Sequence, residues 1–107
     1  KCSNSNDLYT TRVGLITADE VRMAGGTYGQ KNNSYYLYSG QTYWTMSPYY
    51  FNAVSSSAFV YLVWSHGVLY NIHSVYTEYG VRPAINLASN VTLTGSGTMS
   101  DPYVVVE

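Results

Sequence analysis

A long stretch without charged residues limits what this chain can fold into more than any other feature. From Asn32 through Thr77 the sequence contains no Asp, Glu, Lys or Arg, but it is rich in Tyr, Ser, Asn, Trp and His. A core segment would consist mainly of Leu, Ile and Val, and a disordered linker would lack the aromatic residues. The mixture is typical of binding surfaces, because Tyr and Trp offer large rigid contact areas while Ser and Asn adapt their hydrogen bonding.

Two apolar, β-favouring segments enclose the central part of this stretch. They are Tyr43–Pro48 and Gly80–Leu87, and both have the composition of buried strands. We therefore interpret the residues from Tyr49 to Tyr79 as the segment that the rest of the chain presents to a ligand. A chain of 107 residues is long enough to bury one core, which predicts a single ligand-binding domain over residues 1–107.

Composition argues against several classes of partner. The net charge is −1 and charged residues make up 10 % of the chain, so no basic surface is available for nucleic acid or for an anionic membrane. No apolar run approaches the roughly 18 residues that span a bilayer. The chain begins at Lys1 and Cys2 without an initiator Met, which we interpret as a fragment of a longer protein, most naturally its C-terminal part.

Cys2 is the only cysteine, so an internal disulfide is impossible. Two interpretations stay open. The residue is either a free thiol or one half of a disulfide whose partner lies upstream in an extracellular parent chain.

The local signals predict an α+β fold, mainly antiparallel β with one short helix. Thr17 as N-cap and Glu20 three residues later form a capping box, and Gly25 follows the apolar residues that come next. A helix is therefore expected from Thr17 to Ala24. Gly26–Asn33 lacks the glycine spacing of a phosphate-binding loop, and we interpret it as a connection.

Seven segments have the composition of strands. Val81–Leu87 is expected to be buried, with Arg82 at least half-buried and bound to backbone carbonyls. The last segment is expected to close the sheet. The expected strands are Tyr35–Tyr38, Tyr43–Ser47 ended by Pro48, Ala58–Ser65, Val68–Ile72, Val81–Leu87, Val91–Thr94 and Tyr103–Val106.

Residues suited to catalysis or to metal binding are scarce. His66 and His73 have no cysteine or carboxylate nearby in the sequence to complete a zinc site. No serine lies in a Gly-x-Ser-x-Gly motif, the acids form no pair for acid–base catalysis, and carboxylates are too few for a calcium site. We therefore expect a protein that is not an enzyme and that holds neither a cofactor nor a metal ion.

Six short motifs are spread over almost the whole chain: Gly14–Val21, Tyr35–Tyr38, Tyr43–Pro48, Gly80–Leu87, Gly95–Thr98 and Asp101–Val105. In combination they resemble a C-terminal domain of surface and pilin-like proteins of Gram-positive gut bacteria. The resemblance implies a C-type-lectin-like fold, related to the formylglycine-generating-enzyme type, in which a strand with the Gly80-Val81-Arg82-Pro83 motif closes the core. It also implies a ligand-binding role.

Some members of this fold are the variable proteins of diversity-generating retroelements, whose C-terminal region is rewritten at adenines of a template repeat. Adenine mutation of AAY codons yields residues such as Asn, Tyr, Ser and His, but not Lys, Gln, Met, Glu or Trp. From Tyr49 to Tyr79 the residues keep to this set except at Trp64 and Glu78, which need other template codons. The candidate variable and ligand-binding positions are Tyr50, Phe59, Tyr61, Trp64, His66, Tyr70, Asn71, His73, Tyr76, Glu78 and Tyr79.

Three functions from different classes were weighed. The first, which we expect, is an extracellular recognition or adhesion module on a cell surface or pilus that binds a protein in preference to a glycan. The second is a structural pilin-like or phage-tail-like subunit with a fixed surface, in which the tyrosines make subunit contacts. The third is an enzyme of the formylglycine-generating type, which requires catalytic cysteines that Cys2 alone cannot provide.

Overall fold

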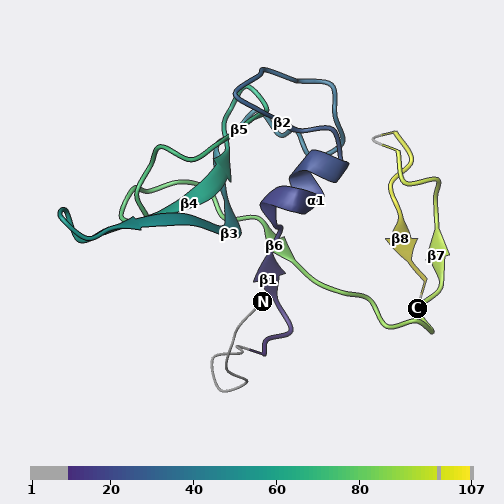
Figure 1. The fold of residues 1–107 in the computed structure, drawn as a ribbon. Helices are drawn as coiled ribbons and strands as arrows, with labels where there is room; N and C mark the ends of the chain where they lie inside the picture. Colours follow the sequence, from purple (N-terminus) through teal and green to yellow (C-terminus); the bar gives the residue numbers. More distant parts are fainter. Residues whose placement is uncertain (1–9, 99, 107) are drawn as a thin grey trace.

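The computed structural model describes residues 10–98 and 100–106, so Cys2 lies outside the described part of the chain. Figure 1 shows a mostly β structure with one short helix, which confirms the α+β class. The strands of the main sheet, in spatial order, are β2 (Thr27–Tyr28), β5 (Val68–Tyr70), β4 (Ser57–Val63) and β3 (Tyr43–Asn52). The other elements are β1 (Gly14–Leu15), α1 (Ala18–Met23), β6 (Pro83–Ala84), β7 (Leu93–Thr94) and β8 (Val104–Val105).

The helix α1 begins as its sequence predicts. The Thr17 side chain accepts a hydrogen bond from the Glu20 backbone N–H at 3.2 Å, and the Glu20 carboxylate accepts one from the Thr17 N–H at 2.8 Å. This capping box satisfies N–H groups that a helix start leaves free. The Thr17 backbone N–H and the Thr17 hydroxyl both donate to the Glu20 carboxylate, and these two bonds lower the pKa of Glu20. The Ala18 N–H donates to Ser47 Oγ at 2.8 Å, which attaches the helix to β3.

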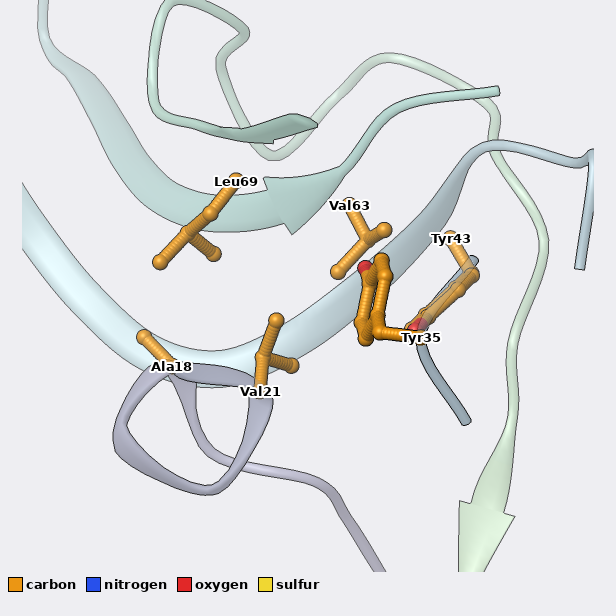
Figure 2. Packing of buried hydrophobic residues seen from close by; sticks show 6 residues of the cluster. All are labelled: Ala18, Val21, Tyr35, Tyr43, Val63 and Leu69. Atoms are coloured by element: carbon orange, nitrogen blue, oxygen red, sulfur yellow. The ribbon is translucent and has the colours of Figure 1, made fainter. Parts of the chain in front are cut away.

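The core lies between α1 and the sheet (Figure 2). Two small residues of the helix face apolar side chains of β4 and β5, and two tyrosines close the side of the cluster. Burying these side chains is the main favourable contribution to folding. The cluster consists of Ala18, Val21, Tyr35, Tyr43, Val63 and Leu69.

The two core tyrosines differ in how their hydroxyl groups are satisfied. The Tyr43 hydroxyl donates to the Leu37 carbonyl at 2.9 Å, whereas the buried Tyr35 hydroxyl has no partner among the residues that the structure describes. Burial raises the pKa of both groups. Each hydroxyl therefore keeps its proton to a higher pH in the folded state than in the unfolded state. The stability that this difference contributes is lost as the pH rises above the ordinary tyrosine pKa of about 10.

We expect Tyr35→Phe to raise the free energy of unfolding by about 1 kcal/mol at neutral pH, because it removes a buried hydroxyl without a partner. Tyr43→Phe is the matched comparison and is expected to lower it by about 1 kcal/mol, because the hydrogen bond to Leu37 is lost. Urea unfolding at pH 7 measures both effects, and its repetition at pH 10.5 measures how much the free energy of unfolding falls at alkaline pH. Equal destabilisation by the two substitutions would show that the Tyr35 hydroxyl is hydrogen-bonded.

Strand β3 differs from the expectation that Pro48 ends it. The strand continues to Asn52 and pairs antiparallel with β4, with the register shifting on both sides of Pro48. Proline lacks an N–H donor, but it is tolerated on an edge strand and at irregular register positions. Because β3 is the edge of the sheet, the β3–β4 hairpin extends past the proline as a long two-stranded arm (Figure 1).

Two expectations for the first half of the chain are wrong. Tyr35–Tyr38 forms a turn and not a strand, since the Tyr38 N–H bonds to the Tyr35 carbonyl at 3.0 Å and the Tyr35 ring is used in the core. The supposed connection Gly26–Asn33 contains β2, which pairs in parallel with β5. A strand of two residues is too short to produce a recognisable local pattern.

The segment Val81–Leu87 is exposed and not a buried strand, and only Pro83–Ala84 pairs, with β1. Arg82 is exposed as well, although its guanidinium donates to the Leu37 carbonyl at 2.7 Å and lies 4.8 Å from the Tyr43 ring centre. The bond to a backbone carbonyl is therefore confirmed, whereas the burial is wrong. Its bond to the Leu37 carbonyl attaches this exposed segment to the rest of the fold.

The C-terminal hairpin does not close the main sheet. Strands β7 and β8 pair with each other in a separate two-stranded sheet, which lies apart from the main sheet in Figure 1. The Cα radius of gyration is 15.9 Å, compared with about 13 Å for a compact domain of 100 residues.

Candidate ligand-binding surface

Ten aromatic rings of the described residues form one continuous series of contacts. Each ring touches the next, with ring centres 4.8 to 6.5 Å apart, in the stacked, tilted and edge-to-face arrangements that aromatic pairs favour. We call this series the aromatic chain. In order of contact its members are Phe59, Tyr50, Tyr49, Tyr61, Tyr28, Tyr70, Trp64, His73, Tyr79 and Trp44.

The aromatic chain starts near the tip of the β3–β4 hairpin. Tyr50 and Phe59 are direct partners across the two strands, so their rings stack at 4.8 Å with planes 10° apart. Tyr49 joins this pair and meets Tyr61 of β4 edge-on at 5.5 Å. The hairpin register therefore sets the first four rings.

The middle of the aromatic chain crosses to the other two strands of the sheet. Tyr28 of β2 contacts Tyr61 edge-on at 6.5 Å and stacks on Tyr70 of β5 at 5.9 Å. The Tyr28 hydroxyl also donates to the side-chain oxygen of Asn71 at 3.0 Å. The parallel pairing of β2 with β5 thus holds Tyr28 between two rings that belong to different strands.

The far end of the aromatic chain turns back to β3. Trp64 contacts Tyr70 at 5.5 Å and His73 at 5.8 Å, and Tyr79 then connects His73 to Trp44. His73 Nδ1 lies 3.2 Å from the Tyr79 hydroxyl, while its buried Nε2 has no partner in the part of the chain that the structure describes. Backbone bonds of Trp44 and Gly80 to the facing segments hold this end in place.

The rings are held by one another and still reach solvent. Tyr28, Tyr49 and Tyr50 are each close to half exposed, and the remaining seven rings are partly buried. Exposed apolar side chains that lie together on one surface are a common feature of interaction sites.

Two pockets are each lined by two or more rings of the aromatic chain. The first has a volume of about 680 Å³, and Tyr28, Tyr49 and Tyr61 line it together with Asp19 and Arg22 of α1. The second has about 350 Å³ and lies at the turn between β4 and β5, where its lining is Gly29, Lys31, Trp64, His66, Val68 and Tyr70. Both volumes fall in the range of ligand pockets.

A family model with the description domain of unknown function, DUF6273, matches residues 9–89. The chain belongs to the DUF6273 family. The matched region contains all ten rings of the aromatic chain and both pockets, whereas β7 and β8 lie beyond its end. The comparisons with curated proteins and with solved structures return no match.

The DUF6273 domain brings together seven of the eleven positions that the sequence singles out. These seven are rings of the aromatic chain: Tyr50, Phe59, Tyr61, Trp64, Tyr70, His73 and Tyr79. Their role in binding stays a prediction, but their spatial continuity is a property that the order of residues does not reveal.

The other four positions have different surroundings. His66 lines the smaller pocket beside Trp64, and Glu78 lines a separate pocket with Tyr79. Asn71 is 5 % exposed and accepts the hydrogen bond from Tyr28, whereas Tyr76 is 80 % exposed. Tyr76 therefore lies outside the aromatic chain, and Asn71 supports a ring of it.

Three rings of the aromatic chain are absent from the sequence-based selection, namely Trp44, Tyr49 and Tyr28. Trp44 belongs to a segment interpreted as a flanking strand, and Tyr28 to one interpreted as a connection. For Tyr49, the aromatic triplet Tyr49–Phe51, which includes the selected Tyr50, was a usable signal.

Among residues 10–98 and 100–106 no group of three or more His, Cys, Asp or Glu side chains could hold a metal ion. No helix within the same ranges has the length and apolar character to cross a bilayer.

Proposed function

We propose that this DUF6273 domain is an extracellular recognition module that binds a protein ligand through the aromatic chain. The observation that carries the proposal is the unbroken series of ten rings over all four strands of the main sheet. Tyr and Trp dominate the energetically important positions of protein interfaces, because they bury large areas at low entropic cost.

The extent and chemistry of the surface favour a macromolecular ligand. The rings come from β2, β3, β4, β5 and the segments that follow β4 and β5, so an extended partner surface fits them better than one small molecule. No charged residue lies between Asn32 and Thr77. The rings that this stretch contributes therefore bind by stacking and by neutral hydrogen bonds.

A C-type-lectin-like fold and diversification by a retroelement belong to the same proposal. They are supported by the sequence motifs and by the residue set between Tyr49 and Tyr79. Sequencing the encoding locus in several isolates tests the diversification. A neighbouring reverse transcriptase, with a near-copy of the codons for residues 49–86 that differs only at adenines, would support it, whereas an invariant stretch among pilus or secretion genes would refute it.

Binding itself can be tested with a displayed library of random dodecapeptides selected on the immobilised 107-residue chain. We expect selected peptides to bind the unmodified chain and to lose affinity for the Tyr61→Ala variant. Tyr36→Ala is the control, because Tyr36 is 69 % exposed and lies outside the aromatic chain. Equal binding to both variants would refute recognition through the aromatic chain.

A structural subunit is the second candidate, favoured by exposed apolar residues on the C-terminal hairpin. Leu93, Tyr103, Val104 and Val105 are all exposed, and an isolated two-stranded hairpin is marginally stable in water. This function predicts that the chain associates with itself through this hairpin and through the tyrosine-rich face. Sedimentation measurements distinguish the two functions, because a recognition module stays monomeric when no ligand is added.

A further inference from the structure

The smaller pocket on the aromatic chain has the features of a site for one anchoring side chain of a ligand. We call it the anchor pocket, and its lining is Gly29, Lys31, Trp64, His66, Val68 and Tyr70. Interfaces of proteins draw most of their affinity from a few large side chains that fill such pockets. The following steps rest on the proposed function.

The apolar walls of the anchor pocket are held in place before any ligand binds. Trp64 and Tyr70 lie 5.5 Å apart with planes inclined by 31°. Tyr28 stacks against Tyr70 at 5.9 Å, and His73 meets Trp64 edge-on at 5.8 Å. A pocket whose rings are already fixed costs little conformational entropy to occupy.

The backbone around the anchor pocket is fixed as well. The turn between β4 and β5 is closed by a bond from the Gly67 N–H to the Trp64 carbonyl at 2.7 Å and by one from the Trp64 N–H to the Val68 carbonyl at 2.8 Å. The Asn32 N–H bonds to the His66 carbonyl at 3.2 Å. This bond connects the segment that bears Lys31 to the turn that bears Trp64.

The charge at the anchor pocket has one sign. Lys31 is the charged residue of the lining, and no carboxylate belongs to it. Lys31 is exposed, so its ammonium group can pair with an anion of a ligand without leaving water. A positive group beside apolar walls selects a ligand that combines a large apolar side chain with a neighbouring carboxylate.

We infer that the anchor pocket binds a Phe, Trp or Leu side chain of a protein ligand, and that Lys31 pairs with an Asp or Glu adjacent to it. The apolar side chain contacts Trp64 and Tyr70, which supplies affinity. The carboxylate supplies selectivity, because a basic residue at the same place in the ligand is repelled.

The test selects the random dodecapeptide library in parallel on the unmodified chain and on the Lys31→Glu variant. On the unmodified chain we expect an acidic residue next to the apolar anchor, and on Lys31→Glu a basic one. Peptides from the first selection are expected to bind Lys31→Glu at least ten-fold more weakly. Arg12→Glu is the matched control, because it makes the same change of charge outside the anchor pocket and should leave their affinity unchanged.

The outcomes separate this inference from the proposed function. If selected peptides lose affinity for Tyr61→Ala but show no acidic preference, or bind Lys31→Glu as well as the unmodified chain, the inference is overturned and recognition through the aromatic chain stands. A similar loss of peptide affinity with Lys31→Glu and with Arg12→Glu would also overturn the inference, because the loss would then come from the change in net charge. If neither selection retains a peptide, both the inference and the proposed function are refuted.

Discussion

Replacement of Gly67 by alanine is expected to lower the free energy of unfolding by about 3 kcal/mol or more, which corresponds to a fall in Tm of about 15 °C for a domain of this size. Gly67 has a φ of +74°, a conformation that residues with a side chain rarely adopt. A Cβ atom at this position would lie 1.6 Å from the Asn32 carbonyl oxygen. The β4–β5 turn and the loop at Asn32 would have to separate to accommodate it.

Gly29→Ala is the matched control for this substitution. Gly29 has a similar φ of +71°, but a Cβ atom there would meet no other atom within 4 Å. We expect this variant to show only the conformational cost, about 1 kcal/mol. Thermal unfolding of both variants measures the difference, and equal losses would mean that the contact between Gly67 and Asn32 does not constrain the fold.

The parts of the fold that sequence could predict depend on local signals. Thr17 and Glu20 specify the start of α1 within one turn of chain, and the capping box forms as expected. The antiparallel β4–β5 pair follows from two β-favouring segments on either side of the turn at His66 and Gly67. In both cases the interacting residues are close in sequence, so the local sequence pattern is enough to predict their contact.

Two parts of the fold could not be predicted, for different reasons. Strand β2 exists because Thr27 and Tyr28 pair with Val68 and Leu69, more than 40 positions later, and the composition of so short a segment does not identify a distant partner. The arm of β3 beyond Pro48 is a local hairpin, in which Tyr50 pairs with Phe59 and Asn52 with Ser57. It was missed because a proline usually ends a strand, and the irregular register that tolerates it here is not visible in the sequence.

The same distinction applies to the candidate site. The choice of positions between Tyr49 and Tyr79 includes seven rings of the aromatic chain, because composition indicates where residue types suited to binding gather. It missed Tyr28, whose place between Tyr61 and Tyr70 depends on the pairing of β2 with β5. The place of a ring in the aromatic chain depends on the tertiary structure, because the aromatic chain joins residues from several strands.

Tyr70 is the ring whose removal is expected to weaken ligand binding most. It connects Tyr28 to Trp64 and lines the anchor pocket, so Tyr70→Ala removes a contact surface and also releases the rings on both sides. We expect a loss of at least about 2 kcal/mol of binding free energy, or about 30-fold in Kd. Titration of a selected peptide against the variant measures this loss.

The expected effect of Tyr70→Ala separates a binding role from a structural one. Tyr70 is only partly buried, while the neighbouring Leu69 is 1 % exposed and belongs to the core. Leu69→Ala is therefore expected to lower Tm strongly, because it leaves a cavity worth about 2–5 kcal/mol, while the folded fraction keeps its affinity. A variant Tyr70→Ala that lowered Tm and retained full affinity would assign this ring to the core. If Tyr70→Ala left both the affinity and the Tm unchanged, Tyr70 would not belong to the binding interface. The aromatic chain would then bind only through its rings on the β3–β4 hairpin.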